Sequence, residues 1–317
     1  SKKDTMARTP GMIFLKEQNM IVEEAIGTRL FDEPPKREPC DVCVSDFDGV
    51  NFKVNVAPEK TNFVTVHINV GLMGEKLKKE LYAPEILEKV YGPMVVTPDK
   101  GYDFAVGVDL DTVKPEEKDG VLKKISCLRR HVLSAPIVKA LDGVKAGTGA
   151  KLPFMMMEMR NNECMFVKPG NDRCTVVYAF NFPDVTDNAL ARVMMQQFAK
   201  ESAKVNGAPP CSYSEAKNPP LEIRDQKIDA YTNGCGFLSF VIFASHISEP
   251  AKYEKAITML STFRNYLHYH IKASKTYLHM RMRKKVAGWL QVLNRSHHEK
   301  DAKEAKTASG KTFKRSS

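Results

Sequence analysis

Two aspartates separated by one residue are the first candidates for chemistry. Asp46 and Asp48 lie in the run Asp46-Phe47-Asp48-Gly49-Val50, after a valine-rich segment. In a phosphatase, one such aspartate attacks a phosphoryl group and the other protonates the leaving oxygen. Here, however, a second alternating strand pattern follows the motif instead of a helix, and no downstream acidic pair has metal-ligand spacing. We therefore favour an Asp-Gly turn between two strands.

Two cysteines have a spacing that occurs in zinc and redox sites. Cys40 and Cys43 are three positions apart, but no second Cys or His pair lies close enough to complete four ligands. No helix pattern follows them, as a thioredoxin-like redox pair would require. The chain has seven cysteines at irregular spacing, which is typical of reduced thiols in the cytosol.

Two further motifs are weak. Ser309-Gly310-Lys311-Thr312 resembles the end of a phosphate-binding loop, but Ala305 stands where the first glycine of that motif would be. His268 and His270 point about 200° apart around a helix, so they cannot share a metal ion and are expected to pack or to form hydrogen bonds. The sequence therefore predicts no catalytic residue, no cofactor and no metal site.

The elements around these motifs follow one order twice. Helix, three strands, helix and strand are predicted first over 12–118 and again over 119–249, which indicates two tandem α+β domains of similar plan, each an antiparallel sheet with flanking helices. Segments 1–11 and 297–317 are predicted to be an N-terminal tail and a basic extended tail. The helices are expected at 18–30, 83–91, 121–141 and 189–200. The strands are expected at 42–44, 50–56, 63–70, 102–110, 152–160, 164–168, 173–182 and 236–244.

A long helix is predicted over 250–296. The segment 251–295 contains no proline and only one glycine, Gly288, and Pro250 suits the first turn. Apolar residues recur there at steps of three and four. This stripe consists of Leu260, Phe263, Leu267, Ile271, Leu278, Met282, Val286, Trp289 and Leu293, with Ser274 in the same series. A helix of about 67 Å is too long for one small domain, so part of the stripe should pack on the chain's own sheets and the rest on a partner.

The positive charge is concentrated in the same region. From Ala251 to Ser317 there are 16 Lys and Arg against 4 Asp and Glu, a net charge of +12, so the rest of the chain carries −2 of the total of +10. No acidic residue occurs between Lys255 and Arg295. Such a region is expected to meet an acidic partner.

Neither a membrane span nor a secretory signal is predicted. The longest nearly apolar run, 235–244, has about half the length that a membrane-spanning helix needs. The first residues, Ser1 to Asp4, are polar, and no apolar segment follows them.

The long helix also carries a family resemblance. The run Thr262-Phe263-Arg264-Asn265-Tyr266-Leu267-His268-Tyr269-His270-Ile271-Lys272 is highly specific. With Ser274-Lys275, Tyr277, His279, Arg281-Met282-Arg283, Val292-Leu293-Asn294-Arg295 and Gly310-Lys311-Thr312-Phe313, it resembles the C-terminal helix and tail of the subunit 2 family of the actin-related protein 2/3 complex. Further support comes from the Asp46–Val50 run, Val90-Tyr91-Gly92, Gly101-Tyr102 and Pro219-Pro220-Leu221-Glu222, so the resemblance covers most of the chain.

The resemblance implies a non-catalytic scaffold. In that family two α+β domains precede a long helix that packs on the matching helix of a smaller scaffold subunit. The pair forms the core of a seven-subunit assembly, holds the two actin-related subunits and lies on the side of an actin filament, supporting nucleation of branched filaments. The implied location is the cytoplasmic actin cytoskeleton, at the cell cortex and in actin patches, with roles in endocytosis and cell motility.

Two sets of site residues are expected on this basis. The expected interface with the partner subunit is Leu278, Met282, Val286, Trp289 and Leu293. The basic residues expected to face the filament are Lys272, Lys275, Arg281, Arg283 and Lys284. The main alternative is a nucleic-acid-binding protein that uses the same basic helix, although no RRM, KH, zinc-finger or helix-turn-helix signature is present. A dehalogenase-like phosphatase at Asp46 is a third option.

Overall fold

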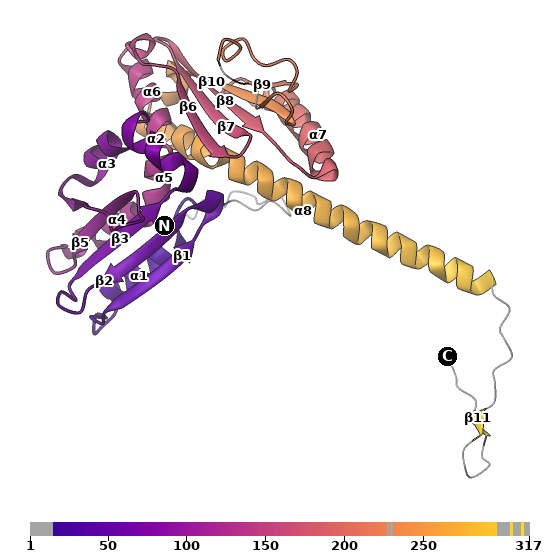
Figure 1. Cartoon of the computed structure of the whole chain (residues 1–317), viewed down its shortest axis with the longest axis horizontal. Coiled ribbons are helices and arrows are strands. Elements are labelled where there is room, and N and C mark those ends of the chain that lie inside the picture. The colour runs from indigo at the N-terminus through magenta and orange to yellow at the C-terminus, as the bar shows by residue number, and fades with distance from the viewer. Residues whose placement is uncertain (1–14, 227, 229–230, 297–304, 307–311, 314–317) are drawn as a thin grey trace. The chain divides into compact units, whose positions relative to one another are not determined.

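A computed structural model describes residues 15–226, 228, 231–296, 305–306 and 312–313 of the chain. It contains two five-stranded antiparallel sheets and a long C-terminal helix (Figure 1). The predicted α+β class is therefore confirmed. The predicted N-terminal tail and most of the predicted basic tail, with Ser309, Gly310 and Lys311, lie outside the described residues.

The first sheet has the strand order β1-β2-β3-β5-β4. Its strands are β1 (Cys40–Ser45), β2 (Asn51–Val56), β3 (Phe63–Asn69), β4 (Val95–Val96) and β5 (Phe104–Asp109). In β2, Phe52, Val54 and Val56 are buried while the residues between them are more exposed, as the period of two in a strand requires. The predicted hairpin is confirmed, because β1 and β2 pair antiparallel.

The second sheet repeats this order as β6-β7-β8-β10-β9. Its strands are β6 (Met155–Arg160), β7 (Glu163–Pro169), β8 (Arg173–Phe180), β9 (Cys211–Ser214) and β10 (Gly236–Phe243). The inner strands β8 and β10 are buried on both faces, which explains why they read as continuous apolar runs. Each sheet lies within one of the two predicted domains, 12–118 and 119–249, whose boundaries stay a prediction.

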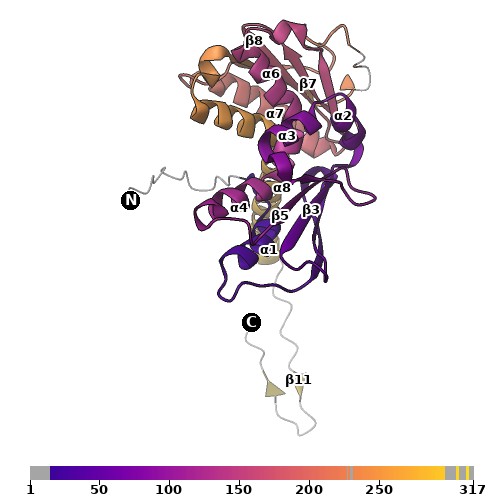
Figure 2. The same cartoon turned by 90° about the vertical axis from the view of Figure 1, so that its left-hand side faces the viewer.

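Short helices flank the first sheet or connect it to the second. They are α1 (Met20–Phe31), α2 (Gly74–Lys79), α3 (Ala83–Tyr91), α4 (Lys118–Ser126), α5 (Leu128–Leu133) and α6 (Ala135–Lys145), and α7 (Val185–Ser202) lies further along the chain. The helix α3 packs on α5 and α6, and α6 packs on β7 and β8, so the described residues up to Ile271 form one unit (Figure 2). One apolar core contains residues of both sheets.

The single helix predicted over 121–141 is wrong in its continuity. The segment forms three helices, α4, α5 and α6, with breaks at Cys127 and Ser134. Pro136 lies in the first turn of α6 and has no backbone N–H to donate to the carbonyl of Val132. A helix that starts anew at Ala135 places Pro136 in its first turn and so avoids this missing hydrogen bond.

The long helix is confirmed as α8 (Pro250–Ser296), 47 residues in one element. Its first half packs on the second sheet. The Phe263 ring lies against those of Tyr178, Phe180 and Phe240, and the Tyr178 hydroxyl donates to the Leu260 carbonyl at 2.5 Å. The predicted packing of the early stripe on the chain's own sheets is therefore confirmed.

Candidate assembly site

The apolar stripe of α8 passes from buried to exposed within about two turns, between Ile271 and Leu278. Leu260, Phe263, Leu267 and Ile271 are all buried in the core. The next members of the stripe are large side chains that are between 41% and 66% exposed: Leu278, Met282, Val286, Trp289 and Leu293. Contiguous exposed apolar residues of this size mark protein interaction surfaces.

The exposed arc is wider than the predicted stripe. Leu290 and Val292 are also more than half exposed. At about 100° per residue around the helix axis, they lie on either edge of the stripe. The described half of α8 beyond Ile271 therefore presents an apolar arc about as wide as that of a helix that packs against a neighbour.

The predicted basic residues lie on both sides of this stripe. Lys272, Arg281, Arg283 and Lys284 are exposed, and Lys275 is half-buried. At about 100° per residue, Arg281 lies on one flank, and Lys272 and Arg283 lie on the other. Lys275 falls within the stripe, and Lys284 lies on the side of the helix away from it. An apolar centre with charged margins resembles the core and rim of a protein–protein interface.

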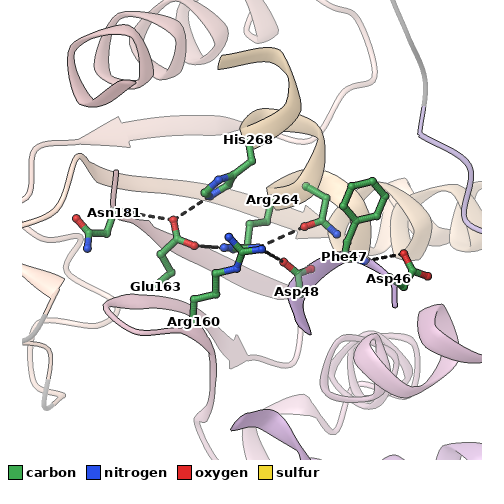
Figure 3. A network of polar contacts seen from close by, with 9 residues as sticks. Asp46, Phe47, Asp48, Arg160, Glu163, Asn181, Arg264 and His268 are labelled. Atoms are coloured by element: carbon green, nitrogen blue, oxygen red, sulfur yellow. Dashed lines mark hydrogen bonds and ion pairs between the residues drawn. The ribbon is translucent and has the colours of Figure 1, made fainter. Parts of the chain in front are cut away.

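A second feature is a buried ion network at the first half of α8 (Figure 3). The Arg264 guanidinium donates through Nη1 to Asp48 and through Nη2 to Glu163, and its Nε donates to Glu163 Oε2 at 2.9 Å. His268, one turn further along α8, lies 2.8 Å from Glu163 Oε1 through its Nε2. The Asn181 backbone N–H donates to the same oxygen at 3.1 Å.

The charges in this network compensate one another. Burial alone would raise the pKa of Glu163, but the hydrogen bond from His268 and the charge of Arg264 outweigh burial and hold this pKa below its usual value. The carboxylate is therefore ionised at neutral pH. Together, Asp48, Glu163 and Arg264 are almost fully buried, and buried charges of this kind persist only when they are paired.

The two aspartates of the first motif are engaged by arginines and amide groups. Asp46 accepts from the side chain of Asn19 at 3.0 Å and lies 3.5 Å from Arg129 Nε. Asp48 lies in the turn between β1 and β2 with a φ of 64° and pairs with Arg264. The Asp-Gly turn is thus confirmed, and both carboxylates are held in structural contacts that a nucleophile would have to leave.

The other motif residues also have structural surroundings. The Cys40 and Cys43 thiols contact the Val54 carbonyl and the Tyr102 hydroxyl, each at 3.9 Å. All seven cysteines are free, and the described residues contain no group of His, Cys, Asp and Glu that could hold a metal. His270 packs on the Tyr266 ring at 4.2 Å, so the prediction that the two histidines pack or hydrogen-bond is confirmed.

The ion network was not predicted from the sequence, although one signal pointed to it. Arg264 stands between Leu260 and Leu267 at helical spacing, on the face that is buried. A charged side chain on a core-facing stripe requires an oppositely charged partner. The partners themselves could not be found from spacing, because Asp48 lies 216 residues and Glu163 101 residues away.

A folded body joined to a helix that exposes an apolar stripe between basic flanks defines an assembly protein. Comparison with known families identifies which one. The model of the P34-Arc family, described as the Arp2/3 complex 34 kD subunit p34-Arc, matches residues 68–300, and the chain belongs to this family. The family is one of structural complex subunits, so the chain is not an enzyme.

Two relatives carry the same name, "Actin-related protein 2/3 complex subunit 2". The protein from Schizosaccharomyces pombe is 34% identical over 96% of this chain and 100% of its own length. That from Dictyostelium discoideum is 34% identical over 85% of this chain and 89% of its own length. The similarity therefore includes both sheets and α8. No helix among the described residues is long and apolar enough to cross a membrane.

Proposed function

We propose that the chain is a scaffold subunit of the Arp2/3 complex. It pairs through the exposed half of α8 with the smaller scaffold subunit, and this pair holds the two actin-related subunits. The complex binds the side of an existing actin filament and supports nucleation of a branch. This function places the protein in the cytoplasmic actin cytoskeleton, at the cell cortex and in actin patches.

The exposed stripe of α8 is the observation that carries this proposal. Fully burying an apolar side chain of this size contributes about 1.5–3 kcal/mol. Five such residues on one face of a helix match the helix-in-groove mode of recognition, in which anchors repeat at three- and four-residue steps. Because the chain belongs to a family of complex subunits, we expect the partner to be another subunit of the same complex.

The basic flanks support the filament contact. Actin filaments are acidic, and the exposed Arg281 lies beside the surface that the partner would cover, while the exposed Lys284 lies further round the helix, away from that surface. On the side of the helix that would face the partner, the apolar stripe separates Arg281 from Lys272 and Arg283. This arrangement favours a protein partner over a nucleic acid, whose phosphates need a continuous basic groove or face.

The pairing is tested with Trp289→Ala combined with Leu293→Ala. Loss of these two contacts should weaken association with the smaller scaffold subunit by about 100-fold or more. The measurement is the affinity of the purified chain for that subunit by titration, together with recovery of the co-expressed complex by size exclusion.

A matched control uses the opposite side of the same helix. Tyr277→Ala combined with Met280→Ala also removes one aromatic and one aliphatic exposed side chain, but these positions lie away from the stripe. Pairing should persist in this control. The proposal is contradicted if the two double variants weaken pairing equally, and a complex that dissociates on nuclease treatment would support a nucleic-acid partner instead.

A further inference from the structure

One guanidinium joins three parts of the folded unit. Arg264 comes from α8, Asp48 from the turn that connects β1 and β2 in the first sheet, and Glu163 from the start of β7 in the second sheet (Figure 3). The two carboxylates approach the guanidinium from opposite sheets. Arg160, more than half exposed, lies 3.9 Å from the same Asp48 oxygen and adds a second cation at the margin.

The geometry of the pairing is directional. Glu163 accepts hydrogen bonds from Nε and Nη2 of Arg264, and Asp48 accepts one from Nη1. The two carboxylates therefore occupy different sides of one planar group. Because the donors of a guanidinium are fixed in a plane, each carboxylate has one favourable position and angle. His268 and the Asn181 amide fix the second carboxylate from further directions.

The position of the Asp48 carboxylate is also fixed by the backbone of its turn. Asp48 has a φ of 64°, a conformation that residues other than glycine adopt rarely. The turn around it is closed by hydrogen bonds from the Asp46 N–H to the Val50 carbonyl at 2.7 Å and from the Val50 N–H to the Phe47 carbonyl at 3.2 Å. An uncommon conformation maintained in this way aims the Asp48 side chain at α8.

The two halves also meet through more exposed ion pairs, such as Lys139 with Glu85 and Lys89 with Asp142, but most of the remaining contact is apolar and less selective. Both sheets contribute to one hydrophobic core, and burial of apolar area is non-directional. Buried ion pairs give little net stability compared with apolar residues of similar volume, but they can favour one arrangement over its alternatives. The network is therefore suited to setting an angle more than to adding stability.

We propose that Arg264 is a positioning residue that fixes the mutual orientation of the two sheets, and that the complex needs this orientation to bind a filament. The second half of this statement rests on the proposed function. The first half concerns the chain alone, so the two can fail separately.

The orientation is measured between two spin labels in the assembled complex. One label is placed on the exposed Cys43 of β1 and the other on Val193→Cys of α7, in a background that lacks the half-buried Cys40 and Cys211. Asp48→Asn removes the charge while Asn tolerates the same positive φ. Glu75→Gln, which removes a carboxylate from an exposed ion pair with Lys79, is the matched control.

We expect a broader or shifted distance distribution in Asp48→Asn and an unchanged one in Glu75→Gln. Amide exchange in the turn of residues 46–50 should accelerate by about tenfold or more, the factor expected when a hydrogen bond to a charged group is lost. A distribution identical to that of the wild type would overturn the proposal.

A combined variant separates orientation from stability. Arg264→Met with Glu163→Met and Asp48→Asn removes every charge of the central trio. Its melting temperature should stay near that of the wild type, while the distance distribution stays broad and filament co-sedimentation falls. A lowered melting temperature with a narrow distribution would show that the network only stabilises, and would refute the proposal. If the triple variant does not fold, the single Asp48→Asn decides.

Filament co-sedimentation shows whether the orientation claim or the proposed function has failed. If the wild-type complex does not bind filaments, the proposed function fails while the distance measurement still decides the role of Arg264. If distances broaden but filament binding is unchanged, the orientation claim holds and its link to function is overturned.

Discussion

At the scale of single residues, the buried polar groups decide how the folded unit responds to acid. Burial, together with smaller effects of the charges of Arg130 and Lys124, lowers the pKa of His131 to about 4. The ring nitrogen Nδ1 lies 2.8 Å from the Tyr91 hydroxyl, which itself donates to the Lys124 carbonyl. Because that hydroxyl proton is committed to Lys124, Nδ1 of a neutral His131 is the donor.

The pH dependence of stability follows from this site. In the unfolded chain the pKa of His131 returns to about 6.5. Between about pH 6.5 and 4 the unfolded state therefore binds more protons than the folded state, and the free energy of unfolding decreases as the pH is lowered. At pH 5 the loss from this group is at most about 2 kcal/mol. His131→Gln should therefore lose less stability than the wild type between pH 7 and 5 in urea unfolding. Parallel pH profiles for the two proteins would contradict this assignment.

At this scale, local turns could be predicted from the sequence, whereas contacts between distant segments could not. The Asp48-Gly49 pair was correctly interpreted as a turn, because turn chemistry is local. The partner of Asp48 could not be predicted, since it lies on α8 and neither spacing nor periodicity reports contacts between distant segments.

At the scale of elements, α8 was the most predictable part of the molecule. The absence of proline and the repeated apolar steps gave its length, and the buried residues Leu260 and Ile271 confirm that the stripe faces the core in its first half. Short elements were missed, among them α2, β4 and β9, because segments of two to six residues carry too little periodic signal. The breaks inside 118–145 were missed because a helical apolar face continues across them.

The basic flanks give a prediction at this scale. Arg281→Glu with Lys284→Glu should reduce filament co-sedimentation and branch density at moderate salt, while the complex still assembles. Each exposed ion pair contributes only about 0.2–1 kcal/mol, so two reversals are needed. The defect should shrink as salt rises, because screening at 0.1 M and above acts over about 10 Å or less.

Reversal on the other flank provides the comparison. Lys272→Glu with Arg283→Glu makes the same change of charge on the opposite side of the stripe. If both pairs reduce filament binding equally, the effect comes from net charge and not from one surface. Normal binding by the Arg281 and Lys284 variant at low salt would place the filament contact on the sheets instead.

At the scale of the whole molecule, the two sheets have the same strand order but share one apolar core. The repeated plan was visible in the sequence because each half shows the same order of periodic patterns. The shared core was not visible, since it depends on how α3, α5 and α6 pack between the sheets. The two segments share a strand order, but through their common core the described residues up to Ile271 pack as one unit.

This packing predicts cooperative unfolding. The described residues up to Ile271 should unfold in one transition, because neither sheet can expose its side of the common core without exposing that of the other. Scanning calorimetry combined with near-ultraviolet circular dichroism of the full chain provides the measurement. Two resolved transitions with separate spectroscopic signatures would show that the halves unfold independently.

The exposed Trp289 has a practical consequence, since it is the chain's only tryptophan. Indole emission shifts to shorter wavelength when water around the ring is replaced by apolar contacts. The unlabelled protein therefore carries its own optical reporter at the centre of the proposed pairing surface. Excitation at the red edge of the absorption band avoids the tyrosines, so assembly could be followed in real time from the emission wavelength of Trp289.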